Sequence, residues 1–511
     1  MTSAAKPAST YDEYPYPGSA FWFTHPDHLA VLAEIHGIAA PHPRAARVLE
    51  LGCGDGANIV SIAASLPGAE CVGVDLSASQ VRIGNALIQR CGLTNIRIVQ
   101  GDVIDMAAAP AAWGQFDYII AHGLYSWVPA AARDAILRII AQTLAPTGAA
   151  MVSYNALPGG HDLAPIRTLV KYHTDPIRQV EGRIRQARSM AEVYLRQLAN
   201  FDPEGREAFA ERLNATVNSM SDHLLRHDWL SDNSVPFYFA DFIATAQTHG
   251  LDFLCNAAPS SQDPDALDEE ARTLLLTVPD RVRRAQYYDF FQHTRFRATV
   301  LRRAETAVTD TAGPEVYADY AIESRMDSES LSADLPPQLT SIVQDESSER
   351  LERERKKFHI VSVGLARHAP APVHIRVVFE EIARDLVAQG LDDGYAATPE
   401  GREDMFRALC GEVGWLFGRE LVALWKAPPS VATELSERPS TGPLQRALTE
   451  QTTHNGFAVS LLHRHLNVTE LEKQVLAVLD GTLTQAELTK RFGPETGVAL
   501  RGLLKKGFLV S

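Results

Sequence analysis

The chain has 511 residues, of which 45% are hydrophobic and 22% are charged, and its formal net charge is −15 at pH 7. At roughly 100–200 residues per domain, this length predicts about three domains with sizeable cores. A general nucleic-acid binder usually carries a basic field, so the acidic charge argues against that class.

The cysteines and the apolar runs exclude further classes. The five cysteines are scattered, with no CxxC pair and no His/Cys ligand spacing. This disfavours a zinc site or a disulfide framework and is typical of a reducing compartment. The first residues, MTSAAKPAST, lack the apolar stretch of a signal peptide, and no run of about 18 uncharged apolar residues occurs. We therefore expect a cytoplasmic protein without a metal site or a membrane span.

The N-terminal segment, residues 1–23, is rich in proline and aromatic residues. A short helix is expected after it, with Thr24 as its cap, Pro26 in its first turn and Gly37 past its end. From residue 47 to 155, apolar strands alternate with helices. The predicted strands are 47–52, 70–76, 96–103, 116–122 and 148–155, and the predicted helices are 57–66, 78–92 and 131–144. This alternation indicates a parallel sheet covered on both faces, a doubly wound, Rossmann-like α/β domain.

The rest of the chain reads as mostly helical. An amphipathic helix is predicted at 236–250, a short strand at 251–255 and a long helical stretch at 280–303. The composition shifts toward Ser, Asp and Glu around 304–355, which is typical of a linker. The predicted domains are a core with an N-terminal lid at 1–160, a helical domain at 161–303, a linker and middle region at 304–400, and a C-terminal domain at 401–511.

The C-terminal tail has clear helix signals. Thr469 with Glu472, and Thr484 with Glu487, match the capping box at two helix starts. Glycines 481, 493 and 507 are placed to end successive helices, and residues 508–510 read as a terminal strand. These features predict a small winged-helix-like unit.

The first strand-to-helix turn, ELGCGDGAN at 50–58, carries a candidate ligand site. Its three glycines let the backbone turn sharply beside the free amides of a helix N-terminus. Asp75 ends the next strand, where its carboxylate can accept hydrogen bonds from ribose hydroxyls. The glycine spacing also satisfies the dinucleotide pattern, so the glycines alone leave NAD open. Glu50, however, suits a cationic ligand with an amino-acid tail and would repel a pyrophosphate.

Across residues 45–155 these motifs resemble the class I S-adenosylmethionine-dependent methyltransferases. By that resemblance Glu50, Gly52 and Gly54 line the methionine end, Asp75 holds the ribose, and Asp102 accepts from the adenine amino group. The full set of cofactor-binding residues implied is Glu50, Gly52, Gly54, Gly56, Asn58, Asp75, Leu76, Gln80, Asp102, Val103 and His122.

The stretch AHGLYSWVP, residues 121–129, ends the fourth predicted strand, which in such a sheet lies beside the reactive methyl group. The Asn/Asp-Pro-Pro-Tyr signature of many amine methyltransferases is absent here. His122, Tyr125 and Trp127 are the candidate catalytic residues, because aromatic faces attract a cationic methyl or ammonium group and exclude water. Tyr14 joins them from the N-terminal aromatic cluster, in which Tyr11, Tyr16 and His25 are further candidates for a lid. Each ring could instead fill the core.

Further segments narrow the resemblance. HDWLSDNSVPFYFADFIATAQTHGLDFL (227–254) and QYYDFFQHTRFRATVLRR (286–303) look like a methyltransferase regulatory domain, and 436–482 is similar to the tail of the same proteins. The group resembles the bacterial protein-lysine methyltransferases that modify outer-membrane protein B. The resemblance implies methyl transfer to lysine amines of a protein, with a surface or outer-membrane protein before its export as the candidate acceptor.

Two alternatives stay open from the residues. The chain could methylate a small molecule or natural product, or it could be a S-adenosylmethionine-sensing regulator whose winged helix binds DNA. Arg501, Lys505 and Lys506 lie on one predicted helix, but three basic residues are more often a solvated face than a DNA reader. We expect no specific nucleic-acid partner.

Overall fold

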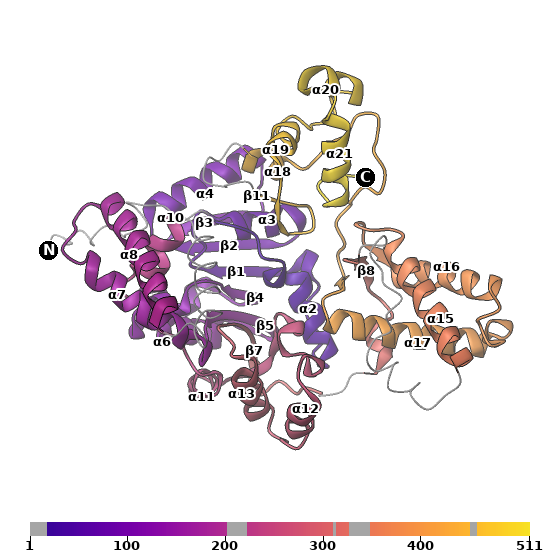
Figure 1. The fold of residues 1–511 in the computed structure, drawn as a ribbon, viewed down its shortest axis with the longest axis horizontal. Helices are drawn as coiled ribbons and strands as arrows, with labels where there is room; N and C mark the ends of the chain where they lie inside the picture. Colours follow the sequence, from indigo (N-terminus) through magenta and orange to yellow (C-terminus); the bar gives the residue numbers. More distant parts are fainter. Residues whose placement is uncertain (1–17, 202–221, 310–312, 327–347, 450–456) are drawn as a thin grey trace.

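The computed structural model describes residues 18–201, 222–309, 313–326, 348–449 and 457–511. Its centre is a seven-stranded sheet with the order β3-β2-β1-β4-β5-β7-β6 (Figure 1). The strands are β1 Arg47–Leu51, β2 Glu70–Asp75, β3 Ile96–Gln100, β4 Phe116–Ala121, β5 Leu144–Asn155, β6 Leu251–Asn256 and β7 Phe296–Arg303. Strands β1 to β5 pair in parallel, and β7 runs antiparallel to both of its neighbours. The predicted doubly wound α/β fold is confirmed.

Helices cover both faces of this sheet, because successive strand residues point to opposite sides. Val48 packs with the face under α2, α3 and α4, whereas Leu49 packs with the face under α5, α6, α11 and α13. The helices are α2 Pro26–Ile35, α3 Ala57–Ser65, α4 Ala78–Cys91, α5 Val103–Ala108, α6 Ala130–Thr143, α11 Phe239–Thr248, α12 Glu269–Leu276 and α13 Arg281–Gln292. The cap of α2 is the His25 side chain, which accepts from the Asp27 amide at 3.2 Å, rather than Thr24 as predicted.

The prediction of one long helix over 280–303 is wrong. Helix α13 ends at Gln292, where His293 takes a left-handed φ of 51°, and residues 296–303 form β7. The arginines of this segment suggest a solvated helix, yet Arg297 is 1% exposed and its Nε donates to Asp289 at 2.8 Å. The sheet therefore takes its last two strands from beyond residue 160, the boundary predicted for the core.

A helical bundle follows the carboxyl end of β5. It contains α7 Ala164–Thr174, α8 Val180–Phe201, α10 Asp222–Leu224 and a π-helical turn at Leu225–Trp229. Ile166, Val170 and Trp229 are among the buried residues of its own small core. Figure 1 shows this bundle at one end of the sheet, opposite the C-terminal helices.

The C-terminal part consists of a small sheet with three helices, followed by a group of short helices and a hairpin. A three-stranded antiparallel sheet, ordered β10-β8-β9, packs with three helices and shares a hydrophobic cluster with α2. Its elements are β8 Ala321–Ser324, α15 Ser348–Ala366, β9 Val373–His374, α16 Ile375–Ala388, α17 Pro399–Gly418 and β10 Val422–Trp425. The last elements are α18 Pro443–Thr449, β11 Phe457–Val459, β12 His465–Asn467, α19 Glu470–Leu476, α20 Gln485–Phe492 and α21 Thr496–Lys505.

Both predicted capping boxes are present, at the starts of α19 and α20. The predicted terminal strand at 508–510 is wrong. Phe508 is fully buried, and the backbone of this segment bonds to separate loops: the Val510 amide donates to the Ser440 carbonyl, and the Leu461 amide donates to the Gly507 carbonyl, both at 3.0 Å.

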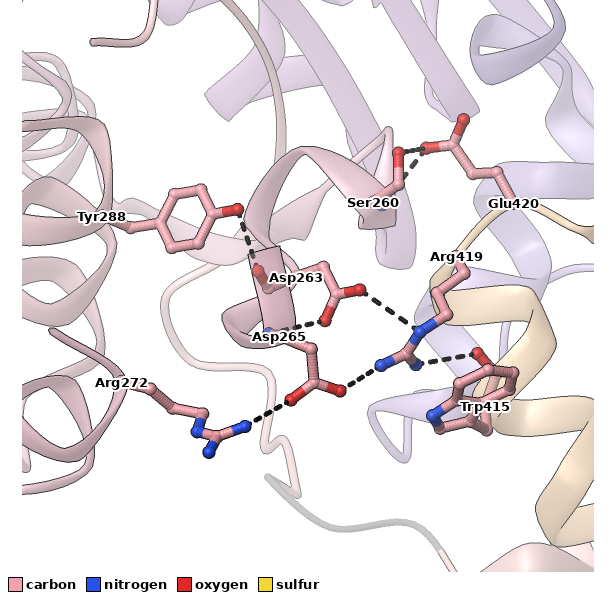
Figure 2. A network of polar contacts seen from close by, with 8 residues as sticks. All are labelled: Ser260, Asp263, Asp265, Arg272, Tyr288, Trp415, Arg419 and Glu420. Atoms are coloured by element: carbon pink, nitrogen blue, oxygen red, sulfur yellow. Dashed lines mark hydrogen bonds and ion pairs between the residues drawn. The ribbon is translucent and has the colours of Figure 1, made fainter. Parts of the chain in front are cut away.

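A polar network fixes the C-terminal part to the end of β6 (Figure 2). Asp265 contacts both Arg272, at 3.2 Å, and Arg419, which follows α17. Glu420 Oε1 accepts from the Ser260 hydroxyl at 2.6 Å and from the Ser260 amide at 3.2 Å. The ion pairs around Arg419 are largely shielded from water, so they are screened less than surface pairs. The sheet and the C-terminal part are therefore held in one arrangement.

Candidate active site

The turn after β1 has the backbone that its glycines predict. Gly52, Gly54 and Gly56 have φ of 70°, 56° and 80°, a region that other residues rarely adopt. A Cβ built on Gly54 would meet no atom within 4 Å, so open space lies above this residue. Gly56 is the N-cap of α3, whose first amides lie beside the turn. This open turn at a helix N-terminus can accept a ligand closely.

Glu50 lies at the end of β1 and is 4% exposed. Its Oε1 accepts from Asn58 Nδ2 at 2.8 Å, while its Oε2 is buried without a hydrogen-bond partner among the described residues. Burial raises the pKa of this carboxyl to about 8, and the Asn58 hydrogen bond opposes the rise. A buried, half-satisfied carboxyl group fits a cationic partner such as the amino group of S-adenosylmethionine.

Asp75, at the end of β2, braces the glycine turn. Its Oδ2 accepts from the Gly54 amide at 2.8 Å, and its Oδ1 accepts from the Ser77 amide at 2.8 Å. Each carboxylate oxygen has a second lone-pair site, so both can also accept from ribose hydroxyls. Leu76 is next in the chain and 50% exposed, and Gln80 is buried in the first turn of α4. Leu76 is thus placed at the surface of the site, whereas Gln80 lies beneath it.

Asp102 lies at the neighbouring edge of the site. The predicted strand 96–103 ends at Gln100, and Asp102 becomes the N-cap of α5 by accepting from the Ile104 amide at 2.9 Å. Val103 packs against the core from the first turn of that helix. The Asp102 carboxylate could still accept from an adenine amino group through its remaining lone pairs.

His122 follows β4 and is surrounded by aromatic rings. Its ring centroid lies 4.1 Å from that of Phe21, 5.3 Å from that of Phe23 and 6.1 Å from that of Phe296. Its Nδ1 is buried without a hydrogen-bond partner among the described residues. Burial lowers the pKa of His122 to about 4, so the ring is neutral at pH 7. The structure therefore places an uncharged imidazole within an aromatic wall.

The two other candidates on this stretch are placed differently. Tyr125 is 3% exposed, and its ring packs in the core at 5.3 Å from Phe237 and 5.2 Å from Phe242. Burial raises the pKa of Tyr125 to about 12. Trp127 is half-buried in a 3-10 turn, Tyr125–Trp127. These positions bring His122, but not the Tyr125 ring, to the aromatic wall.

The N-terminal lid is described only from Gly18 onward, so Tyr14, Tyr11 and Tyr16 lie outside the described residues. The described part, residues 18–24, is held on the core. The Gly18 amide donates to Asp55 at 2.9 Å, and the Phe21 amide donates to Asn58 Oδ1 at 3.1 Å. His25 is buried behind the lid and bonds to Ser65 at 2.8 Å.

Phe21, Phe23, Phe296 and His463 are site residues that the sequence did not identify. The aromatic run AFWF marks the first two, since it lies in the predicted lid. Phe296 begins β7, which was read as helix. His463 comes from the other end of the chain and has no local signal. Within the described ranges no group of three or more potential metal ligands gathers, and no helix is long and apolar enough to cross a membrane.

Comparisons with known proteins agree with this geometry. A methyltransferase-domain family matches residues 48–148, and a predicted methyltransferase regulatory domain matches residues 221–303. The latter range contains α11, β6, α13 and β7, so this domain completes the sheet.

Relatives occur in Rickettsia. The uncharacterized protein RP789 of Rickettsia prowazekii is 36% identical over 294 residues, which cover 57% of this chain and 52% of that protein. The uncharacterized protein RP028 of the same organism is 31% identical over 238 residues, which cover 47% of this chain and 94% of that protein. The chain therefore spans about half the length of the first relative and nearly all of the second.

A solved structure shares the whole fold. PKMT2 from Rickettsia typhi, in complex with AdoHcy, has a TM-score of 0.81 at 21% identity, covering 97% of this chain and 100% of that one. The glycine turn, the buried Glu50 and the matched families together establish the cofactor as S-adenosylmethionine. The chain belongs to the class I S-adenosylmethionine-dependent methyltransferases that carry a methyltransferase regulatory domain.

Proposed function

We propose that this methyltransferase transfers its methyl group to a protein, on the amines of lysine side chains. The observation that carries the proposal is the aromatic wall at the end of β4. Phe21, Phe23 and Phe296 lie around a neutral His122, and among the described residues no charged side chain is recorded in contact with these rings. Such an apolar surface suits a long aliphatic side chain, and removal of its terminal amine from water favours the neutral form of that amine.

Bound S-adenosylmethionine supplies an electrophilic methyl group on a sulfonium. The lysine nitrogen forms a bond to the methyl carbon as the sulfur–carbon bond breaks, and the bonding pair stays on sulfur as the neutral thioether. The new methylammonium then loses a proton to water when a further transfer follows. The protein contributes alignment and water exclusion, and His122 Nδ1 can accept a hydrogen bond from the incoming amine.

The roles of the site residues are part of this proposal. Glu50 and Asn58 would hold the amino-acid end of the cofactor, Asp75 the ribose, and Asp102 with Leu76 and Val103 the adenine. His122 and Trp127 would face the acceptor. The fold is similar to that of PKMT2 over nearly the whole chain, and the resemblance of the sequence to the bacterial protein-lysine methyltransferases supports a protein acceptor here.

Three finer points also belong to the proposal. The acceptor is a surface or outer-membrane protein, and it is modified in the cytoplasm before export. The three helices α19 to α21, of which the first two begin with capping boxes, form a winged-helix-like unit that helps to bind this protein. Fractionation of export-blocked cells would test the order of events, since methylated acceptor should then accumulate in the cytoplasm.

The test of the acceptor class is methyl transfer from labelled S-adenosylmethionine into a cell extract, followed by mass spectrometry. We expect label in protein, on lysine, with the wild-type enzyme and none with Asp75→Ala. Label confined to small molecules would contradict the proposal in favour of a small-molecule methyltransferase. Cofactor binding without turnover, together with salt-dependent DNA binding, would favour a regulator.

A further inference from the structure

The C-terminal hairpin β11–β12 reaches the cofactor turn of the core. The connection between its strands carries His463, which is 1% exposed although it lies near the end of the chain. His463 has a left-handed φ of 55°, an uncommon conformation for a residue other than glycine. Its imidazole is therefore held in place on the first turns of α3 by a strained turn.

The imidazole makes two hydrogen bonds to α3. Nδ1 lies 2.8 Å from Ser61 Oγ, and Nε2 lies 3.0 Å from Asn58 Oδ1. Asn58 is the residue whose Nδ2 donates to Glu50 at 2.8 Å. A line of contacts thus leads from the C-terminal hairpin through one amide to the buried carboxyl group.

One assignment of protons satisfies the whole cluster. Burial lowers the pKa of His463 to about 3, so its ring is neutral and has one donor and one acceptor. Nε2–H then donates to Asn58 Oδ1, and Nδ1 accepts from the Ser61 hydroxyl. The Thr24 hydroxyl can donate its hydrogen bond to the Phe21 carbonyl, which lies 2.8 Å away. Asn58 Oδ1 then accepts from the Phe21 amide and from His463, and the Thr24 hydroxyl, 3.0 Å away, is a further possible donor to it.

This assignment fixes which way the Asn58 amide faces. Two donors at Oδ1 exclude the flipped amide, because its NH₂ would then meet two N–H groups. The unflipped amide must present Nδ2 to Glu50. Without His463, only groups of the lid segment would set this orientation, namely the Phe21 amide and the Thr24 hydroxyl.

The same hairpin also holds the lid directly. Ser19 Oγ, in the segment that carries Phe21 and Phe23, contacts His465 Nδ1 of β12. The N-terminal lid is therefore pinned from two sides, by α3 of the core and by the C-terminal hairpin.

We infer that His463 is a positioning residue of the methyltransferase: through Asn58 it orients the donor that Glu50 needs to bind the amino-acid end of the cofactor. The inference rests on Glu50 facing that end of the cofactor, and it is independent of which acceptor is methylated. It gives the C-terminal hairpin a part in cofactor binding that the matched families, at 48–148 and 221–303, do not contain.

The test compares two substitutions that each keep one half of the contact. In His463→Gln the side-chain amide reaches the place of Nε2 and can still donate to Asn58. In His463→Asn the shorter amide replaces only Nδ1 and keeps Ser61. Asparagine tolerates a left-handed φ better than glutamine, so folding strain ranks the two variants in the opposite order to the expected binding.

The measurement is the affinity of the full-length protein for S-adenosylhomocysteine by titration calorimetry, with the melting temperature recorded for each variant. We expect His463→Asn to bind about tenfold more weakly and His463→Gln within about threefold of wild type. His368→Asn is the matched control, because His368 bonds to Glu381 on the C-terminal helices and should leave affinity unchanged.

A second readout separates positioning from a merely structural role. The Asn58 hydrogen bond lowers the pKa of Glu50, so its loss in His463→Asn should move the pH midpoint of ligand affinity upward. Equal affinity in both variants and wild type would overturn the inference. So would an equal loss in both that follows the melting temperature. Failure to methylate protein would leave this binding test unaffected.

Discussion

The carboxyl group of Glu50 provides the sharpest test of how this site binds its cofactor. Before binding, burial holds the pKa of Glu50 at about 8, so at pH 7 about nine in ten molecules carry a protonated, neutral Glu50. An ammonium group beside Oε2 favours the ionised form. Binding at pH 7 should therefore release about 0.9 proton from this residue, and binding at pH 9 only about 0.1.

The same linkage predicts the affinity. Between pH 7 and pH 9 the competent, ionised fraction of Glu50 rises about tenfold, so its contribution to the affinity for S-adenosylhomocysteine rises by the same factor. Glu50→Gln removes the pH dependence that comes from ionisation of Glu50. The pH dependence that remains then comes from the amine of the ligand itself. Calorimetry at pH 7 in two buffers of different ionisation heat, for both proteins, measures the difference in protons released. Equal release by wild type and Glu50→Gln would refute the assignment of Glu50 to the ligand's amino group.

Stability should move in the opposite direction to affinity. The folded pKa of Glu50 lies above its unfolded value of 4.5, so stability is lost as pH rises from 4.5 toward 8. At pH 7 the loss is of order 3 kcal/mol. Glu50→Gln, which cannot ionise, should therefore raise the unfolding free energy of the ligand-free protein at pH 7 while it weakens binding. Lower stability of the variant at pH 7 would contradict this reasoning.

Three further changes have defined outcomes. Asp75→Ala removes the carboxylate proposed to hold the ribose and releases the Gly54 amide, and it should weaken binding of S-adenosylhomocysteine by about 2 kcal/mol, or about 30-fold, in calorimetry. Tyr125→Phe should keep turnover within about twofold, whereas Tyr125→Ala should lower the unfolding free energy in urea by about 3–5 kcal/mol, because the ring is core. Burial lowers the pKa of His28 from 6.5 to about 4, so its share of stability is lost as pH falls below 6.5. His28→Gln should accordingly reduce the stability lost between pH 7 and 5 by about 2 kcal/mol.

The sequence predicts most of the first five strands and the cofactor turn because their signals are local. Apolar strands, glycines with positive φ and a carboxylate at or just after the ends of the first three strands occur within a few residues of one another. Strand β7 was missed for the opposite reason. Its arginines imply a solvated helix unless one knows that Arg297 pairs with Asp289 and that Arg302 pairs with Asp252 on the adjacent strand.

The placement of the candidate catalytic ring of Tyr125 also depends on residues far away in the sequence. A tyrosine three residues after a histidine at a strand end can point into the site or into the core, and no local pattern distinguishes the two. Here helix α11 and the turn before it supply Phe242 and Phe237, which enclose Tyr125. Those residues lie more than a hundred positions later, and the sequence does not show which face they cover.

Long-range contacts matter most in the C-terminal part, where they link the sheet to the cofactor turn. Arg419 and Glu420 anchor it to the end of β6 (Figure 2), and the hairpin that follows then delivers His463 to Asn58. Through these two distant attachments the C-terminal part contacts both the sheet, at Ser260 and Asp265, and the cofactor turn, at Asn58. A protein acceptor that contacts the C-terminal part would therefore act on the β11–β12 hairpin, whose His463 bonds to Asn58 and, through it, reaches Glu50. Coupling between two binding sites is reciprocal. If such an acceptor raises the affinity for the cofactor through Asn58 and Glu50, bound cofactor raises the affinity for the acceptor by the same factor.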